Sequence, residues 1–222
     1  MSAQRAAVVA RVAADVLALP GSGVRRVAVD GFDGSGKTCF ADELGEELAG
    51  CGVSVVRASV DDFHHPPAVR YRRGRASPEG FFRDSYDYDR LLRLLLDPLG
   101  AGGSGRFVRR SYDVHSERPV ECLTETATPG SVLVFDGIFT HREELVGCWD
   151  YSVWLDVPFA VSIPRGAQRG DGDGDPDPAA PANRRYVEGQ RRYLAACRPR
   201  ERATVVIDNE HLDRPRPIYP PD

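Results

Sequence analysis

The chain has 222 residues, 41% of them hydrophobic and 28% charged, which indicates a single globular domain with a buried core. With 29 basic and 33 acidic residues its net charge is −4, so overall charge argues against a protein that binds nucleic acid. Its apolar runs are shorter than the roughly 18 residues of a membrane span, so no membrane partner is expected. The 5 cysteines include no CxxC pair and favour a reducing cytoplasm, and we expect each to be a small buried side chain.

Periodic hydrophobic residues predict strands and helices that alternate along the chain. An amphipathic helix is expected first, at about residues 2–19, and it lacks the continuous apolar stretch of a signal peptide. The strands expected after it cover residues 24–30, 53–60, 107–112, 132–135, 151–157 and 204–207, and the helices cover about 38–49, 77–96 and 183–196. Strands that alternate with helices form βαβ units, so we expect an α/β fold of three layers, with a central parallel sheet flanked by helices.

Residues 31–38, with the sequence GFDGSGKT, match the phosphate-binding pattern GxxxxGK[ST] between an expected strand and an expected helix. Glycines let the backbone wrap a polyphosphate, the lysine reaches the β- and γ-phosphates, and the hydroxyl after it ligates Mg²⁺. Lys37 is also the only lysine among the 29 basic residues. We therefore expect ATP, with Mg²⁺, to bind Gly31, Asp33, Gly34, Ser35, Gly36, Lys37 and Thr38.

Several classes of protein share this loop, and the rest of the chain separates them. A GTPase of the usual kind reads guanine with an NKxD motif, which needs a second lysine that this chain lacks. A motor or AAA-type ATPase normally needs a chain longer than 222 residues. A small-molecule kinase remains, and it requires an acceptor site, a base and a mobile lid that excludes water from the γ-phosphate.

Carboxylates follow two of the expected strands. Asp61 and Asp62 come after the second strand, and Asp136 comes after the strand at 132–135. Ligands of an open parallel sheet lie at the carboxyl ends of its strands, so these carboxylates are expected to face the phosphates. Asp61 would accept the proton of the acceptor hydroxyl, and Thr38, Asp61 and Asp136 would hold the metal. The alternative for each aspartate is the cap of a surface turn.

Several segments occur in an order that is typical of one family. They are the phosphate-binding loop, DDFH at 61–64, YDVHSER at 112–118, FDGI at 135–138, and Arg165 with Arg169. This order resembles the uridine kinase and phosphoribulokinase group of P-loop kinases, especially bacterial proteins similar to uridine kinase, over roughly residues 24–209. The resemblance implies a P-loop NTPase fold, with residues 1–222 in one kinase domain and a mobile lid at about 165–186.

The same resemblance implies roles for individual residues. Asp61 matches the catalytic aspartate, and Asp136 matches the metal-site carboxylate of the family. Arg165 and Arg169 would act with Lys37 and Asp61 as catalytic residues, by clamping the transferring phosphate from the lid. The substrate-binding candidates besides Asp61 are His64, Tyr112 and His115 at the nucleoside, with Arg185 and Gln190 as weaker candidates.

The function expected from the sequence is a cytoplasmic kinase that uses ATP and Mg²⁺ to phosphorylate a small-molecule hydroxyl. The 5′-hydroxyl of uridine or cytidine is the leading acceptor. A kinase of similar fold for a sugar, a pantothenate-like compound, a nucleoside monophosphate or a specialised metabolite is the alternative. A nucleotide-binding regulator without turnover also stays open, as does assembly into a homo-oligomer.

Features outside these motifs receive plainer interpretations. The acidic segment at 170–183 reads as a mobile loop, because Pro176 and Ala182 stand where a calcium loop needs Gly and Glu. The arginines within residues 70–75 are expected on a solvated face, with an anionic acceptor as the second interpretation and RNA as the last. His141 and His211 are expected at the surface or in turns.

Overall fold

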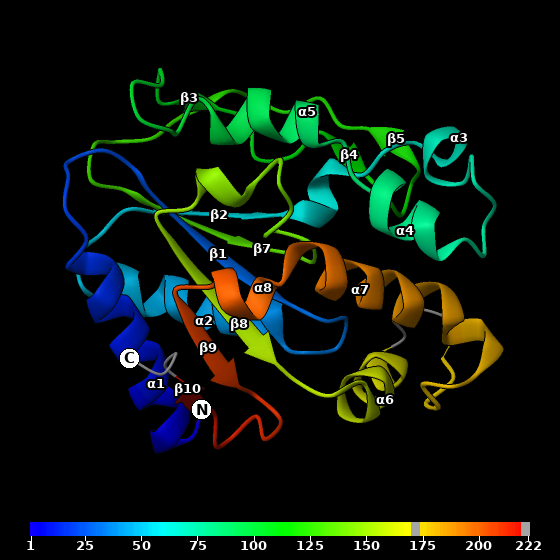
Figure 1. Ribbon diagram of the computed structural model, residues 1–222. Coiled ribbons are helices and arrows are strands. Elements are labelled where there is room, and N and C mark those ends of the chain that lie inside the picture. The colour runs from blue at the N-terminus through cyan, green and yellow to red at the C-terminus, as the bar shows by residue number, and fades with distance from the viewer. Residues whose placement is uncertain (170–173, 219–222) are drawn as a thin grey trace.

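The computed structural model describes residues 1–169 and 174–218, except for the side chain of Arg169. A six-stranded sheet with the order β10-β9-β8-β1-β7-β2 forms its centre (Figure 1). The parallel strands are β1 (Arg25–Gly31), β2 (Val55–Ser59), β7 (Val132–Asp136), β8 (Tyr151–Asp156) and β9 (Val205–Asp208), and β10 (Arg216–Ile218) pairs antiparallel with β9. The α/β fold and its parallel sheet are therefore confirmed, whereas the edge strand β10 was not expected.

Helices cover both faces of this sheet (Figure 1). The α-helices are α1 (Ala3–Leu17), α2 (Lys37–Gly50), α3 (Pro67–Arg70), α4 (Pro78–Asp84), α5 (Tyr88–Leu91), α6 (Phe159–Arg169), α7 (Arg184–Cys197) and α8 (Pro199–Arg202). Shorter turns are the 3₁₀ segments η1 (Val60–Phe63), η3 (Val146–Cys148) and η4 (Pro181–Asn183), and the π-helical turn η2 (Leu92–Leu96). No helix within residues 1–169 and 174–218 combines the length and the apolar character that crossing a membrane requires.

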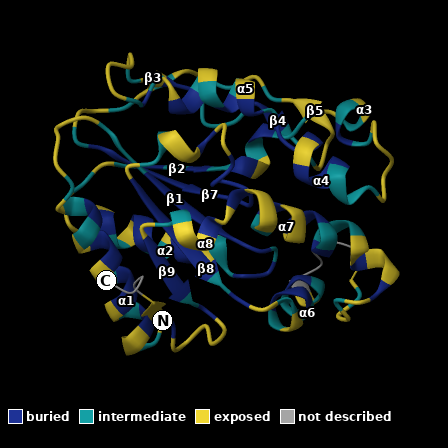
Figure 2. Ribbon diagram, viewed as in Figure 1, coloured by how far each residue is buried: buried dark blue, intermediate teal, exposed yellow. Residues whose placement is uncertain are grey.

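The sheet separates two hydrophobic cores, because successive strand residues point to opposite faces. Val132 and Val134 pack in the core that α1 and α2 complete. Leu133 and Phe135 pack in the other core, with aromatic and aliphatic side chains of α4, α5 and α7. Figure 2 shows the strands between these layers as buried along most of their length. The carboxyl ends of the strands, where β1 and β7 finish, carry the residues of the candidate site.

The single helix expected at residues 77–96 is wrong, since the chain forms α4, α5 and η2 there. Tertiary hydrogen bonds interrupt the helix at residues 85–87. Asp87 N donates to Phe63 O at 2.8 Å, and the Ser85 carbonyl accepts from His65 N at 2.9 Å. The Asp87 side chain then accepts from Arg90 N and begins α5. The break turns residues 84–88 toward the segment that follows β2. Hydrophobic periodicity alone does not predict this change of direction.

Further local expectations need correction. Residues 107–112 form no single strand: β3 (Arg106–Phe107) pairs with β6 (Glu125–Thr126), and β4 (Tyr112–Asp113) pairs with β5 (Arg118–Pro119). His141 lies in a turn, which was one of the two expectations, but it is buried, with Nδ1 donating to Asp30 Oδ2 at 2.8 Å. Among the cysteines only Cys197 is buried; Cys39 and Cys51 are exposed, and Cys122 and Cys148 are half-buried. Position in the fold, rather than residue type, decides these exposures.

Candidate active site

The phosphate-binding loop joins β1 to α2 and takes the shape that its glycines permit. Gly34 and Gly36 have φ angles of 76° and 91°, in the left-handed region that other residues rarely adopt. A Cβ on Gly34 would stand 2.0 Å from the Ser162 carbonyl oxygen, so the loop and α6 approach too closely for a side chain. Lys37 Nζ donates to Phe32 O at 2.8 Å, which holds the ammonium group over the loop.

Side chains from β1, α7 and the segment after β9 hold the loop backbone at three points. Asp30 Oδ1 accepts from Gly31 N at 2.7 Å, and Gln190 Oε1 on α7 accepts from Asp33 N at 2.9 Å. Asn209 Nδ2, after β9, donates to Ser35 O at 2.7 Å. Gln190 thus contacts the loop itself, whereas the sequence analysis assigned it to the acceptor.

The Asp30 carboxylate is fully buried beneath the loop, so it requires hydrogen-bond donors around it. Its Oδ2 accepts from Thr140 Oγ1 at 2.9 Å, from His141 Nδ1 at 2.8 Å and from the Tyr193 hydroxyl of α7. Burial raises the pKa of Tyr193, so the phenol stays a donor to this carboxylate. The loop therefore starts on a buried polar network whose hydrogen bonds compensate for burial of the carboxylate.

Oxygen ligands suited to Mg²⁺ lie at the first turn of α2 and the end of β7. Thr38 Oγ1 donates to Asp136 Oδ2 at 2.8 Å, and Asp136 Oδ1 accepts from Arg57 Nη2 at 3.1 Å. Within residues 1–169 and 174–218, no group of three or more His, Cys, Asp or Glu side chains is arranged to hold a metal. A hydroxyl and one carboxylate fit Mg²⁺, since this ion usually takes few protein ligands and completes its shell with water and phosphate oxygens.

Asp61 lies in η1, directly after β2. Its Oδ1 accepts from the Tyr86 hydroxyl at 3.1 Å, and Ser59 Oγ accepts from Asp61 N at 3.3 Å. Asp62 is tied elsewhere, since its Oδ1 lies 3.0 Å from Arg110 Nε. Burial raises the pKa of Asp62 despite this arginine. The two neighbouring carboxylates thus have different surroundings.

One cavity of about 880 Å³ brings the donor and acceptor candidates together. Its wall includes Lys37, Thr38, Asp61 and Asp136, with His115 on the acceptor side. Residues of this wall that sequence reasoning did not single out include Phe81, Tyr86, Ile163 and Tyr186. The sequence shows only that these side chains are aromatic or aliphatic, and residues of the hydrophobic core have the same character.

His64 and Tyr112 are engaged by neighbouring residues. His64 Nδ1 donates to Asp61 O at 2.8 Å, and its ring lies 4.5 Å from the ring of Tyr86. Burial lowers the pKa of His64, which favours the neutral imidazole. The buried Tyr112 donates its hydroxyl to Glu117 Oε2 at 2.9 Å, and Glu117 also pairs with Arg70. Neither His64 nor Tyr112 is among the residues that line the large cavity, whereas His115 is.

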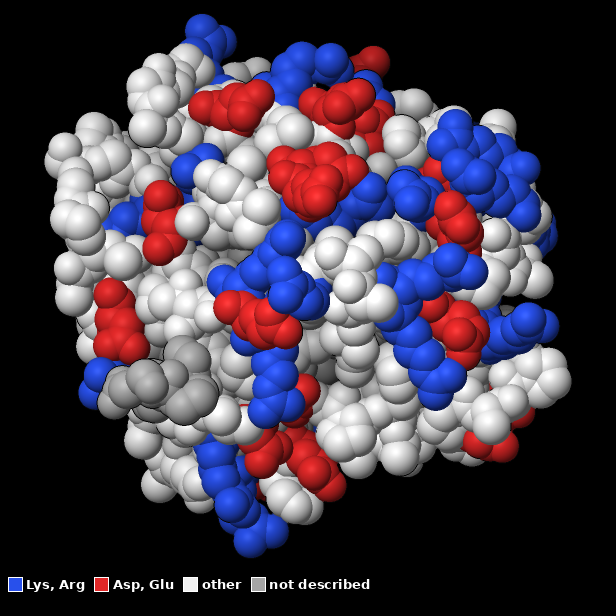
Figure 3. All heavy atoms as spheres, viewed as in Figure 1, with Lys and Arg blue, Asp and Glu red and all other residues white. Residues whose placement is uncertain are grey.

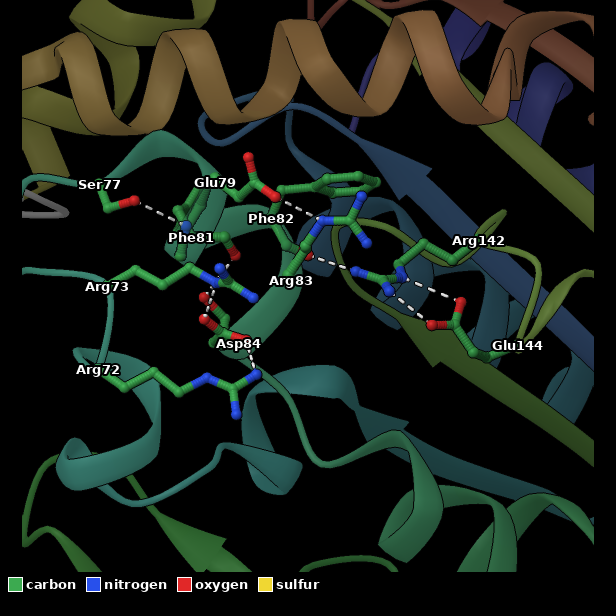
Figure 4. A network of polar contacts seen from close by, with 12 residues as sticks. Arg72, Arg73, Ser77, Glu79, Phe81, Phe82, Arg83, Asp84, Arg142 and Glu144 are labelled. Atoms are coloured by element: carbon green, nitrogen blue, oxygen red, sulfur yellow. Dashed lines mark hydrogen bonds and ion pairs between the residues drawn. The ribbon is translucent and has the colours of Figure 1, made fainter.

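Most arginines of residues 70–75 are paired with named partners. Arg72 and Arg73 both bind Asp84 at the end of α4, with 2.9 Å from Arg73 Nε to Asp84 Oδ2 (Figure 4). Figure 4 also shows Arg142 reaching the Phe82 carbonyl and Glu144. These contacts fix both sides of α4, which carries Phe81 into the cavity wall.

Arg185 of α7 lies among aromatic rings. Its guanidinium is 5.0 Å from the Tyr71 ring and 5.5 Å from the Phe81 ring, and Nη1 donates to Arg75 O at 2.6 Å. Figure 3 shows basic side chains over α3 and α7 with acidic ones between them. Arg185 thus holds α7 against the region after α3.

The expected lid begins with α6, whose residues Ile163, Gly166 and Ala167 line the cavity. Arg165 donates through Nη1 to Asn209 O at 3.1 Å and through Nη2 to Glu210 O. The side chain of Arg169 and residues 170–173 lie outside the described part of the chain. Asn183 Nδ2 donates to the Asp175 and Asp177 carbonyls, each at 2.8 Å, so the acidic segment has ordered turns from residue 174 onward.

Comparisons with known proteins agree with this geometry. The sequence model of the "Phosphoribulokinase / Uridine kinase family" matches residues 27–171. A solved structure described as a possible uridine kinase from Bacillus stearothermophilus is 23% identical, with a TM-score of 0.70, and the match covers 89% of this chain and 96% of that one. A D-glycerate 3-kinase from Cryptococcus neoformans is 12% identical, with a TM-score of 0.57 and 88% of each chain covered. No curated protein matches significantly. At these identities the two structures establish the shared fold.

Proposed function

The chain belongs to the phosphoribulokinase/uridine kinase family of P-loop kinases, and we propose that it transfers the γ-phosphate of ATP to a hydroxyl group of a nucleoside. The observation that carries this proposal is the single cavity that Asp61 shares with Lys37, Thr38 and Asp136. A base, a phosphate-binding lysine and metal ligands in one cavity are the parts that phosphoryl transfer needs.

Each residue of the site has a distinct proposed task. The loop and Lys37 bind the β- and γ-phosphates, and Asp61 accepts the proton of the attacking hydroxyl at its carboxylate. The Tyr86 hydroxyl bonded to Asp61 Oδ1 orients that carboxylate and leaves Oδ2 for the proton. Thr38 and Asp136 would hold Mg²⁺, which neutralises phosphate charge when it is bound.

The arginines of α6 complete the proposed catalytic set. Arg165 and Arg169 are four residues apart in the sequence, a spacing that predicts one shared face on a helix. Arg165 is held at the carbonyls after β9, beside the loop. We assign Arg169, at the end of α6, to the charge that develops on the transferring phosphate, because a preorganised cation there acts chiefly in the transition state.

The acceptor side favours a flat, partly apolar molecule. Phe81, Tyr86 and Tyr186 contribute aromatic surface to the cavity, and His115 adds a polar group. A pyrimidine base can stack on such rings while its ribose carries the 5′-hydroxyl toward Asp61. Uridine or cytidine is therefore the proposed acceptor, and a sugar or a hydroxy acid such as glycerate is the competing class.

The test is initial-rate kinetics with ATP and Mg²⁺ against uridine, cytidine, ribose and D-glycerate, with detection of the phosphorylated product. We expect a phosphate ester with uridine or cytidine and little with the other two. A preference for ribose or glycerate would retain the kinase assignment and overturn the nucleoside. Binding of ATP with no ester from any acceptor would favour a nucleotide-binding regulator instead.

A further inference from the structure

Helix α1 lies outside residues 27–171, which the family model matches, yet its first turn reaches the segment that follows β9. Ser2 Oγ donates to Asp213 O, and Gln4 Nε2 donates to Pro215 O at 3.3 Å. Arg5 Nη1 donates to Leu212 O at 3.1 Å. Hydrogen bonds thus connect the backbone of residues 212–215, after β9, to the start of α1.

Arg5 also connects this segment to the phosphate-binding loop. Its Nε lies 2.7 Å and 2.9 Å from the two carboxylate oxygens of Glu43 on α2, and Nη1 donates to Asn209 Oδ1 at 3.2 Å. Asn209, which is 0% exposed, donates through Nδ2 to Ser35 O. The amide of Asn209 therefore accepts from Arg5 on one side and donates to the loop on the other.

These contacts border a second cavity of about 480 Å³. Its lining includes Arg5, Glu43, Leu212 and Arg165, together with Gly36 and Cys39 of the loop region. Gly36 and Cys39 also line the large cavity, so the two cavities meet along the loop. A Cβ on Gly36 would come within 3.1 Å of Asn209 Nδ2, which shows how closely the segment after β9 approaches the loop.

The position of this cavity limits what it can hold. The triphosphate follows the loop, and Asp61 places the γ-phosphate and the acceptor in the large cavity. The nucleoside part of the donor must then leave the loop at its other side, where the second cavity lies. Arg5 can affect the binding of the nucleotide without contacting it, because Arg5 holds the cavity wall that the nucleotide would contact.

We propose that α1 is part of the phosphate-donor site, and that Arg5 is a positioning residue that acts through Asn209 on the loop and on the wall formed by residues 209–213. The proposal rests on the kinase function proposed above, because it concerns the same donor. Helix α1, which lies outside the residues that the family model matches, would thus affect the affinity for the nucleoside part of ATP. Acceptor binding and the chemical step do not depend on it.

The test compares Arg5→Gln and Asn209→Ala with the matched control Arg11→Ala. Arg11 lies on the same helix, its side chain is 65% exposed, and it forms an ion pair with Asp15. In Arg5→Gln we expect the KM for ATP and the Kd for ADP to rise about tenfold, as loss of one charge-assisted hydrogen bond would do. The kcat and the acceptor KM should stay near the parent values, and Arg11→Ala should change none of these. Arg5→Lys should recover part of the ADP affinity, because it keeps the charge without the planar fork.

Other outcomes separate this proposal from the kinase assignment. If Arg5→Gln and Asn209→Ala lower thermal stability but leave the ATP KM and ADP Kd unchanged, α1 is only a structural brace and the proposal is overturned. If Arg5→Gln does not fold, Asn209→Ala decides by the same readouts. A parent enzyme that binds ADP but phosphorylates no acceptor would overturn the proposed function, while the ADP titrations would still decide the role of Arg5. A parent enzyme that binds no ADP would overturn both.

Discussion

The donor and acceptor sides of the large cavity are built in different ways. The donor side is one continuous loop, residues 31–38, whose backbone shape follows from its own glycines. The acceptor side is assembled from η1, α4, the region around His115 and the start of α7. Long-range ion pairs such as Arg70 with Glu117 and Arg73 with Asp84 hold those pieces in place.

The difference means that the two sides should respond differently to substitution. On the proposed assignment, a change at Lys37 in the loop removes a group that contacts phosphate, so it should alter transfer without altering the fold. A change in the acceptor side should act through the ion pairs that place α3 and α4, so it should lower stability together with acceptor affinity. The substitutions below test this contrast in order of decreasing expected effect.

The largest effect is expected at Lys37 on the donor side. Lys37→Met should remove phosphoryl transfer and leave thermal stability unchanged, because the ammonium group donates to Phe32 O within the loop itself. Lys37→Arg should also fail, since a planar guanidinium does not fit a loop shaped around an ammonium group. Steady-state kinetics and thermal melts measure both properties. Near-native turnover by Lys37→Arg would contradict the assignment of this loop.

Asp61 should have the next largest effect, where the two sides meet. Asp61→Asn is expected to lower kcat by about 10²-fold or more, as loss of a general base does. Asp62→Asn is the matched control and should change kcat much less, because Asp62 faces Arg110. Initial rates at saturating ATP and acceptor compare the two variants. A larger effect at Asp62 would show that the neighbouring aspartate is the base.

Asp84 tests the ion pairs of the acceptor side. Its side chain is 1% exposed. Burial alone would raise the pKa of Asp84, but hydrogen bonds and charge from Arg72 and Arg73 hold that pKa below its ordinary value. Asp84→Asn should destabilise the fold by about 1–2 kcal/mol and raise the acceptor KM severalfold.

The pH dependence of this contribution has a definite sign. Because the folded-state pKa of Asp84 is lowered, its stabilising effect is present above the unfolded-state pKa of about 3.9 and is lost as pH falls through the lower folded value. Thermal melts of parent and Asp84→Asn should therefore converge in acid. Glu79→Gln, which removes exposed pairs with Arg83 and Arg192, is the control. An Asp84→Asn protein as stable as the control at neutral pH would contradict the role of this pair.

The smallest effect is expected from the hydroxyl that orients Asp61. Tyr86→Phe removes the 3.1 Å hydrogen bond to Oδ1 and should lower kcat by about threefold to tenfold. Tyr88→Phe is matched to it, because the Tyr88 hydroxyl is buried and has no hydrogen-bond partner in the part of the chain that the structure describes. Equal kcat values for the two variants would show that Tyr86 does not position the base.

The same contrast explains what the sequence could predict. The loop is a contiguous pattern, so its place between β1 and α2 and the order of alternating elements could be predicted from local residues. The strands β7 and β8 were likewise predictable, because both are short apolar runs buried on two faces. Asp61 and Asp136 could be proposed because they follow strands whose ends meet at one edge of the sheet.

The acceptor side escaped prediction because its contacts join residues far apart in the chain. The break between α4 and α5 depends on backbone bonds to residues 63 and 65 rather than on residues 85–87 alone. Tyr86 became a site residue through that break. The supports of the loop on the donor side escaped prediction for the same reason. Gln190 and Asn209 reach the loop from positions 157 and 174 residues away, and the buried His141 bonds to Asp30. Neither hydrophobic periodicity nor the spacing of motifs in the sequence indicates such long-range contacts.

The most direct test of the account is single-turnover transfer of a labelled γ-phosphate from ATP, followed in the parent enzyme and in Asp61→Asn. We predict that both proteins bind ATP with similar affinity, that the parent forms a labelled phosphate ester on a nucleoside hydroxyl, and that Asp61→Asn forms it about 10²-fold more slowly or worse. Label that appears only as inorganic phosphate, or equal rates for the two proteins, would contradict the claim that donor and acceptor meet at Asp61.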